Sequence, residues 1–135
     1  MKRLESFTLP LRVSEDIVRM RQAVREQATG FGFSLVDQTK MVTAASELAR
    51  NTVLHGGGGE VIVEPLVEGR RKGVRLTFID QGPGIADIDT AMRDGYTTGS
   101  GLGLGLGGAK RLSNEFEIAS RVGQGTRVRI TRWGG

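Results

Sequence analysis

The stretch Asp80-Gln81-Gly82-Pro83-Gly84 interrupts the chain between regular elements and decides how they are arranged. Two β-like runs precede it, residues 60–67 and 74–80, and a basic turn with a glycine at each end, residues 69–73, joins them as a hairpin. A short helix is expected after it, at residues 87–93. The stretch therefore closes a hairpin and precedes a helix, which predicts a fold that combines antiparallel strands with helices.

One strand and two helices are expected on the N-terminal side of this hairpin. Residues 7–13 alternate loosely and include a proline, which is typical of an edge strand. Ser14 is expected to cap a helix that ends near Gly30, because apolar residues recur there at steps of three or four. Ser34 is expected to cap a second helix that runs to about Leu54.

A helix and a closing hairpin are expected on the C-terminal side. The helix covers residues 109–113, and the hairpin strands cover residues 116–121 and 126–132. The resulting order is β-α-α-β-β-α-β-β. It predicts an α/β protein built as a two-layer α+β sandwich, with a mixed, mostly antiparallel sheet and helices on one face. We expect a single domain over residues 1–135.

The composition excludes several classes of function. The chain contains no cysteine and one histidine, His55, which excludes thiolate catalysis, disulfides and histidine-rich metal sites. The net charge is only +4, and its densest basic cluster, residues 70–72, lies between turn glycines, so we expect no nucleic-acid partner. No apolar run could span a membrane and the N-terminus lacks a secretory signal, so we expect a cytoplasmic protein without a membrane partner.

Glycine is in excess, with 21 copies, and seven of the fourteen residues from 95 to 108 are glycine. A Walker A loop is rejected because no Lys-Ser or Lys-Thr pair follows these glycines. Gly103, Gly105 and Gly108 have the spacing of a dinucleotide fingerprint, but they lie late in the chain and lead into a hairpin instead of a βαβ unit. Neither of these nucleotide loops explains the glycines.

Four elements spread over the chain predict a different kind of site. Glu47 and Asn51 lie four residues apart on the second expected helix and share one face, with His55 one turn further on. Asp80 ends a buried strand, where a carboxylate is costly unless it has a partner. The other two elements are Gly99-Ser100-Gly101-Leu102-Gly103-Leu104-Gly105 and Gly123-Gln124-Gly125-Thr126.

These residue types suit phosphoryl transfer from a magnesium-bound nucleotide. The amide oxygen of Asn51 is a hard, neutral ligand for Mg²⁺, and the carboxylate of Glu47 can accept a proton from a nucleophile. Backbone N–H groups of glycines can approach phosphate oxygens closely. The segment 95–108 is also expected to act as a lid that orders when nucleotide binds, because glycine loses much backbone entropy on ordering.

In this order the four elements resemble the N, G1, G2 and final threonine boxes of the GHKL (Bergerat-fold) ATPase superfamily, over residues 35–132. Within it the chain is most similar to the RsbT-type family of switch serine/threonine kinases, which are anti-sigma regulatory kinases of the stressosome. The stretches that carry this closer resemblance are Ser46-Glu47-Leu48-Ala49-Arg50-Asn51, Asp80-Gln81-Gly82-Pro83-Gly84-Ile85, Asp94-Gly95-Tyr96-Thr97-Thr98, and Gly101-Leu102-Gly103 leading into Lys110-Arg111-Leu112.

The resemblance implies a role for each candidate residue. Glu47 is implied as the general base, Asn51 as the Mg²⁺ ligand, and His55 as a phosphate contact, with a helix-capping histidine as the alternative. Asp80 is implied to accept a hydrogen bond from the adenine amino group, and Thr126 to reach adenine through water unless it is an ordinary strand residue. The other implied nucleotide-binding residues are Gly82, Gly84, Thr98, Gly99, Gly101, Leu102, Gly103, Leu104 and Gly105.

The function that the resemblance implies is an ATP- and Mg²⁺-dependent protein serine/threonine kinase in a partner-switching pathway. Its substrates would be STAS-domain scaffold and antagonist proteins of the RsbS and RsbR kinds, and its released target an RsbU-like phosphatase. Two alternatives stay open. One is an anti-sigma factor kinase that sequesters a sigma factor directly, and the other is the detached catalytic domain of a histidine kinase.

Overall fold

The computed structural model describes residues 5–93 and 105–134 of the chain. The regular elements of these residues are, in chain order, β1 (Phe7–Leu11), α1 (Ser14–Gly30), α2 (Leu35–Arg50), η1 (Asn51–His55), β2 (Gly59–Glu68), β3 (Arg71–Asp80), α3 (Ile88–Ala91), α4 (Leu106–Arg111), β4 (Glu115–Ser120) and β5 (Thr126–Gly134). The strands and the two long helices follow the expected order, and both expected short helices, α3 and α4, lie between β3 and β4, where the order β-α-α-β-β-α-β-β counts only one.

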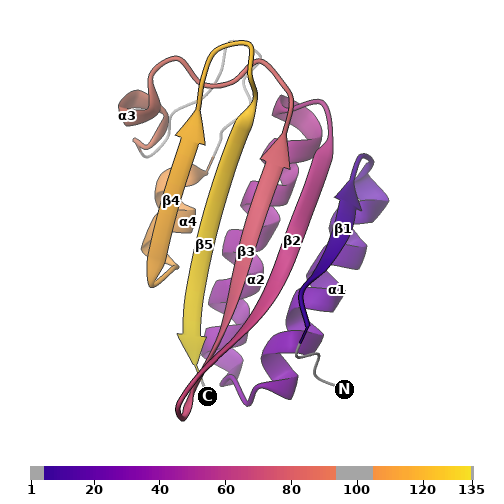
Figure 1. Ribbon diagram of the computed structural model, residues 1–135, viewed down its shortest axis with the longest axis vertical. Coiled ribbons are helices and arrows are strands. Elements are labelled where there is room, and N and C mark those ends of the chain that lie inside the picture. Colours follow the sequence, from indigo (N-terminus) through magenta and orange to yellow (C-terminus); the bar gives the residue numbers. More distant parts are fainter. Residues whose placement is uncertain (1–4, 94–104, 135) are drawn as a thin grey trace.

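The strands form a five-stranded sheet in the order β1-β2-β3-β5-β4. Every neighbouring pair is antiparallel, so the mixed character expected from the sequence does not occur among the described strands. The reason is connectivity: β2–β3 and β4–β5 are hairpins, and two antiparallel helices return the chain to the end of the sheet where β1 finishes. Helices α1, α2 and α4 lie behind the sheet in Figure 1, which confirms the two-layer α+β sandwich.

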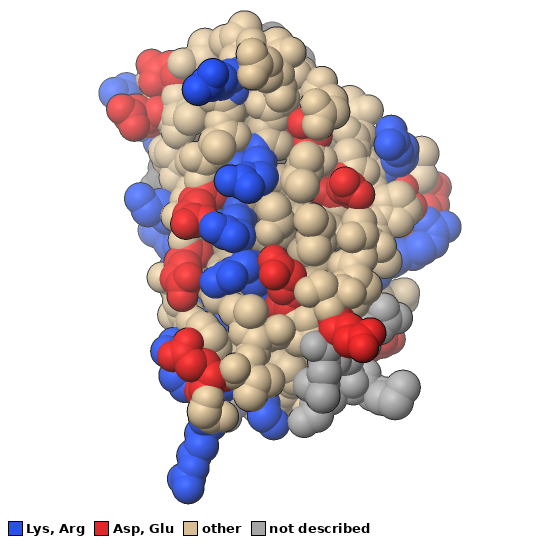
Figure 2. All heavy atoms as spheres, viewed as in Figure 1, with Lys and Arg blue, Asp and Glu red and all other residues tan. Residues whose placement is uncertain are grey.

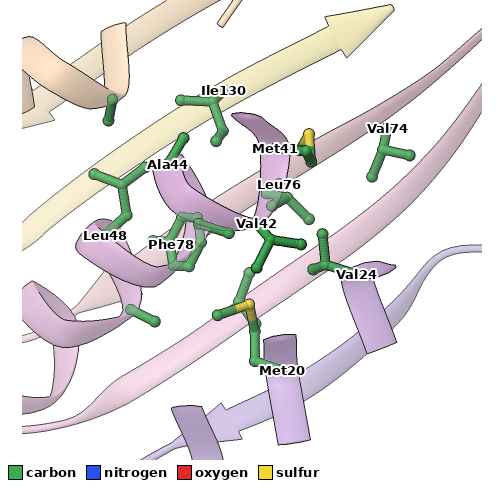
Figure 3. Close-up of a cluster of buried hydrophobic side chains, with 14 of the residues drawn as sticks. Met20, Val24, Met41, Val42, Ala44, Leu48, Val74, Leu76, Phe78 and Ile130 are labelled. Carbon is green, nitrogen blue, oxygen red and sulfur yellow. The ribbon is translucent and has the colours of Figure 1, made fainter. Parts of the chain in front are cut away.

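The core lies between these helices and the inner face of the sheet (Figure 3). Alternate strand residues point inward and meet the apolar stripes of α1 and α2. Burying one large apolar side chain stabilises the fold by about 1.5–3 kcal/mol. The central residues are Met20, Val24, Met41, Val42, Ala44, Leu48, Val74, Leu76, Phe78 and Ile130. Their packing fixes α2 over β3 and β5, the elements that carry most of the candidate site.

The two long helices begin in different ways. At α2 the Ser34 hydroxyl accepts a hydrogen bond from the Asp37 N–H at 3.1 Å, which confirms the expected cap. At α1 the expected cap is wrong, because Ser14 is already helical and Val13 occupies the capping position. The Asp16 carboxylate instead accepts hydrogen bonds from the backbone N–H groups of the two residues before the helix, at 2.8 and 3.2 Å. These two bonds lower the pKa of Asp16.

The end of α2 differs from the sequence prediction. Regular α-helix stops at Arg50, one turn early, and the chain continues as the π-helical turn η1, in which the Gly56 N–H donates to the Asn51 carbonyl at 2.9 Å. The Thr52 hydroxyl donates to the Leu48 carbonyl at 2.9 Å, a bond of the kind that distorts helices. Widened turns of this type are frequent at functional sites. This one begins and ends with a candidate site residue.

Several other boundaries also move. β3 begins at Arg71 instead of residue 74, so the turn expected over residues 69–73 narrows to residues 69–70. β1 ends at Leu11 instead of residue 13, because Asp16 holds the next two backbone N–H groups. α4 begins at Leu106 instead of residue 109, because the Leu106 side chain is buried against the core and draws Gly107 and Gly108 into the helix. These shifts alter the helices only locally, and no helix in the described ranges is long and apolar enough to cross a membrane.

Candidate functional site

Two neighbouring strands form the floor of the site. Asp80 is the last residue of β3, Thr126 is the first of β5, and the two are partners across the β3–β5 ladder. Asp80 is only 8% exposed, and its Oδ1 accepts a hydrogen bond from the Gly82 N–H at 2.9 Å. One neutral backbone donor compensates only part of the cost of burying a carboxylate. The environment of Asp80 therefore favours a ligand that donates hydrogen bonds.

Glycines surround Asp80 because the backbone passes too close for side chains. A Cβ at Gly56 would overlap the Asp80 side chain, and a Cβ at Gly125 would overlap the Asp80 carbonyl. A Cβ at Gly82 would lie 2.6 Å from the Gly56 carbonyl oxygen, closer than real Cβ contacts come. Only glycine fits at these three positions. The glycines that follow η1 and β3 and the glycine that precedes β5 thus shape one wall around a single carboxylate.

The loop after β3 is held by the β4–β5 turn. The Ile85 N–H donates to the Ser120 hydroxyl at 2.8 Å, and the Gly123 N–H donates to the Pro83 carbonyl at 2.8 Å. Gly84 has φ +76°, and a Cβ there would overlap the backbone of the same turn. The loop that follows Asp80 is therefore fixed at both its middle and its end.

Helix α2 and turn η1 bring their candidate residues over this floor. Asn51 and His55 line the same narrow pocket as Asp80 and Thr126. The structure therefore brings together four candidates that come from three separate parts of the sequence. The remaining lining residues are Leu48, Thr52, Phe78, Ile85, Leu106 and Val128.

The pocket is nearly closed, with only about 20 Å³ of open space. Ligand sites usually hold about 300–1,000 Å³. Its apolar walls and few polar groups suit an aromatic base with a polar edge. Ile85 and Leu106 are the apolar wall residues that belong neither to the sheet nor to α2. Leu106 is buried in the core cluster, and Ile85 packs against that cluster.

His55 contributes a polar atom that the described residues do not satisfy. Its Nε2 atom is buried and has no hydrogen-bond partner in the described part of the chain. Leaving such an atom unsatisfied costs about 1–3 kcal/mol, which a ligand group can recover. The alternative role, capping of the helix end, is not performed by this nitrogen among those residues.

Glu47 lies at the edge of the pocket. It is half-buried on α2, one turn before Asn51, and it is not among the pocket-lining residues. A Cβ at Gly105 would lie 2.5 Å from the Glu47 Oε2, and Gly105 has φ +62°. The chain therefore enters α4 directly against this carboxylate. Glu47 thus lies against Gly105, directly before the pocket-lining residue Leu106.

Part of the expected site falls outside the described residues. It consists of Thr98, Gly99, Gly101, Leu102, Gly103 and Leu104. The expected lid is described only from Gly105 onward.

Residues at the site that were not among the candidates include Gly56 and Ser120. Gly56 could have been found from the sequence, because it opens the run of glycines directly after His55, where the chain passes from a helix to a strand. Ser120 could not have been found, because only the pairing of β4 with β5 places it opposite Thr126.

The donor groups fit a magnesium-bound nucleotide. Asn51 offers an amide oxygen and Glu47 a carboxylate, and Mg²⁺ prefers oxygen ligands. Across residues 5–93 and 105–134 there is no cluster of three or more His, Cys, Asp or Glu side chains that could hold a metal. Mg²⁺ needs only one or two protein ligands when phosphates and waters supply the others. The residues present therefore fit an ion that binds together with phosphate.

Comparison with known sequences agrees with this geometry. The family described as histidine kinase-, DNA gyrase B-, and HSP90-like ATPase matches residues 36–133. The serine/threonine-protein kinase RsbT of Bacillus subtilis is 46% identical over 118 residues, which cover 87% of this chain and 89% of RsbT. An anti-sigma F factor of a Thermoanaerobacter species is 32% identical over 97 residues, which cover 67% of this chain and 66% of that protein. The resemblance inferred from the sequence is confirmed.

Solved structures share the fold. The RsbU and RsbW domains of a Mycobacterium tuberculosis protein align with a TM-score of 0.65 and 24% identity, over 96% of this chain and 33% of that chain. The catalytic domain of the histidine kinase ThkA aligns with a TM-score of 0.53 and 13% identity, over 95% of each chain. At these identities the likeness concerns the fold alone.

Proposed function

The chain belongs to the family of histidine kinase-, DNA gyrase B- and HSP90-like ATPases, and we propose that it is a protein serine/threonine kinase that uses Mg-ATP. The match to RsbT, a serine/threonine-protein kinase, supports this because it covers most of both chains. The proposed protein substrate is a STAS-domain protein that presents a serine or threonine hydroxyl.

The observation that carries the proposal is the pocket shared by Asp80, Thr126, Asn51 and His55. Asp80 is proposed to accept a hydrogen bond from the adenine amino group. Gly56, at the far end of the helix from Glu47, lies against Asp80. The nine steps along the chain from Glu47 to Gly56 span at most about 13 Å, at 1.5 Å per residue. This length is comparable to that of an extended nucleotide, with the base at Asp80 and the phosphates toward Glu47.

Catalysis is proposed to rest on positioning and on charge neutralisation. Asn51 would hold Mg²⁺, which when bound neutralises charge on the phosphate oxygens. Glu47 would accept the proton of the partner's hydroxyl as that oxygen bonds to the γ-phosphorus. The bond from the γ-phosphorus to the β–γ bridging oxygen breaks, and ADP leaves with the electron pair.

The proposed partners are STAS-domain proteins of the RsbS and RsbR kinds, with an RsbU-like phosphatase as the target released after phosphorylation. The identity to RsbT supports this choice. A second candidate function is that of an anti-sigma factor kinase that holds a sigma factor directly, which the identity to an anti-sigma F factor favours.

Phosphorylation of a STAS partner with labelled ATP and Mg²⁺ tests the activity. We expect an acid-stable phosphate on serine or threonine of the partner. An acid-labile, base-stable phosphate would instead indicate a histidine kinase. Stable capture of a sigma factor by the chain, in a pull-down with purified components, would favour the second candidate.

Nucleotide selectivity tests the pocket. ADP with Mg²⁺ should raise the unfolding temperature because it binds only the folded chain, whereas GDP should not. Asp80→Asn should remove most of the ADP shift, since the Gly82 N–H holds one side-chain oxygen and the amide then presents an N–H₂ donor where the second carboxylate oxygen accepted. Asp87→Asn is the matched control, because Asp87 caps the short helix α3 through Thr90 and does not line the pocket. Equal shifts with ADP and GDP would contradict the assignment of Asp80.

A further inference from the structure

Ser120, the last residue of β4, connects several parts of the site through one hydroxyl group. The Ile85 N–H donates to its Oγ at 2.8 Å, and its O–H lies 3.0 Å from the Gly125 carbonyl oxygen. Its Oγ also lies 2.8 Å from the Thr126 Oγ1, and either hydroxyl could donate that bond. Ser120 and Thr126 are direct partners across the β4–β5 ladder. The three contacts join the loop after β3, the β4–β5 turn and the pocket wall.

The single hydroxyl hydrogen of Ser120 decides the direction of these bonds. A carbonyl oxygen only accepts, so the bond to Gly125 uses the Ser120 hydrogen. The bond between the two hydroxyls is then donated by Thr126. Ser120 accepts from both Thr126 and the Ile85 N–H, which an oxygen with two lone pairs can do. All three contacts are satisfied together only in this arrangement.

The consequence falls on the hydroxyl group of Thr126, which is one of the residues that line the pocket. Its hydrogen is directed at Ser120, so only its lone pairs remain for a ligand or a bridging water. Its neighbour Asp80 is a carboxylate, which accepts and does not donate. The wall formed by Asp80 and Thr126 therefore offers acceptors only.

An acceptor-only wall discriminates between purines. The amino group of adenine carries two N–H donors, whereas guanine has a carbonyl oxygen at the same ring position. A site built to receive donors rejects an analogue that presents an acceptor, because buried acceptors are then left unpaired.

We propose that Ser120 is a positioning residue for base selectivity, which fixes the Thr126 hydroxyl as an acceptor and thereby favours adenine over guanine. This inference rests on the proposed function, in which Asp80 and Thr126 face the base. Ser120 acts on the nucleotide only through Thr126 and through the loop that ends at Ile85.

The test compares the dissociation constants of Mg-ADP and Mg-GDP by titration calorimetry on the whole chain. Ser120→Ala releases the Thr126 hydrogen, which can then be donated to the guanine carbonyl. The ratio of the GDP constant to the ADP constant should fall about tenfold, the size expected for one hydrogen bond. Ser120→Thr keeps a hydroxyl at the same place and should retain the ratio of the unmodified chain.

A merely structural role for Ser120 would weaken ADP and GDP equally, and an unchanged ratio in Ser120→Ala would overturn the inference while leaving the proposed function intact. Thr126→Val supplies the matched control, because it removes the hydroxyl through which Ser120 is proposed to act. Adding Ser120→Ala to Thr126→Val should therefore leave the ratio of the GDP constant to the ADP constant unchanged. A further fall in the ratio there would also overturn the inference. Equal ADP and GDP affinity in the unmodified chain would remove the proposed function and this inference together. If Ser120→Ala does not fold, Ser120→Cys carries the same prediction, because a thiol sulfur is a weak acceptor and would hold the Thr126 hydrogen poorly.

Discussion

The two ends of the sheet use polar groups in opposite ways. At the end that carries Asp80 and Thr126, glycines let backbone approach backbone, and polar atoms face a pocket. Toward the opposite end, charged side chains pair with one another, and the Nε atom of Arg132 is the group there that has no partner among the described residues. Arg132 donates to the Asp37 carboxylate at 2.6 Å and to the Leu112 carbonyl at 2.8 Å. This cluster ties the start of α2 to β5 and to the end of α4.

The uncovered face of the sheet continues the pattern of internal pairing. Figure 2 shows basic side chains in a column along the sheet with acidic side chains beside them. Arg129 on β5 is bonded to Glu117 on β4, and Arg75 on β3 lies 3.7 Å from Glu115 on β4. Near the chain end, Arg71 stacks 4.0 Å above the Trp133 ring. These charges are engaged with neighbours on the same face.

The difference separates two tasks within one sheet. Internal pairing stabilises the fold modestly and leaves little for a ligand to bind. At the glycine-rich end the pocket-lining residue His55 has a buried Nε2 atom with no hydrogen-bond partner in the described ranges. Changes at the glycine-rich end should therefore affect chemistry and binding, whereas changes at the opposite end should affect stability alone.

The largest expected effect is that of Glu47→Gln on phosphoryl transfer. The amide keeps the shape of the side chain but cannot accept the proton, so the rate should fall about a thousandfold. Mg-ADP affinity should stay within about twofold, because the exchange leaves the pocket lining intact. The rate is measured with labelled ATP and the STAS partner. Glu26→Gln, at an exposed position of α1, is the control, and transfer at the parent rate in Glu47→Gln would exclude Glu47 as the base.

The second effect compares two glycines of the same turn. Gly123 and Gly125 have φ +78° and +84°, but a Cβ at Gly123 meets nothing within 4 Å, whereas one at Gly125 overlaps the Asp80 carbonyl. Gly123→Ala should lower the free energy of unfolding by about 1–2 kcal/mol, the cost of the left-handed conformation. Gly125→Ala should lower it by about 3 kcal/mol or more and should also weaken ADP binding. Urea denaturation measures both, and equal losses would show that the close approach to Asp80 is not restrictive.

Most of the fold could be predicted because local patterns and global arrangement agree. Apolar residues at helical spacing, glycine-marked turns and alternating strands predict the element order that the structure has. The end of α2 could not be predicted, because the π-helical turn depends on how Thr52 bonds back to Leu48 and on where the chain crosses to β2. The start of α1 could not be predicted for a similar reason. It depends on the Asp16 carboxylate, which accepts hydrogen bonds from the backbone N–H groups of Arg12 and Val13.

The candidate site likewise has a part that could be predicted from the sequence and a part that could not. Asn51, His55, Asp80 and Thr126 belong to short motifs, and the structure places them in one pocket. Their roles, and that of Glu47, stay predictions. The walls could not be found from motifs, because they depend on contacts between distant segments.

The third effect lies at the internally paired end. Asp37→Asn removes the ion pair with Arg132, whose side chain is 13% exposed, and should lower the free energy of unfolding by about 1–2 kcal/mol at pH 7. The hydrogen bond from Arg132 holds the pKa of Asp37 below its ordinary value. The stabilisation is therefore complete above the unfolded pKa of about 3.9 and is lost as the pH falls through the lower folded value. The difference in the free energy of unfolding between the unmodified chain and Asp37→Asn should vanish in strong acid. The Mg-ADP affinity should be unchanged in Asp37→Asn, which distinguishes this end of the sheet from the site.

The smallest effect is expected at Arg71, whose guanidinium group stacks on Trp133, the only tryptophan of the sequence. Arg71→Gln removes the charge above Trp133 and an exposed ion pair with Glu68 at 3.5 Å. Exposed contacts of both kinds are weak, so the free energy of unfolding should fall by only about 0.5–1 kcal/mol. Trp133 fluorescence follows the unfolding transition directly, and Arg70→Gln in the same turn is the matched control. A change in Mg-ADP affinity with Arg71→Gln would break the separation between the two ends, because this residue lies at the end of β3 opposite Asp80.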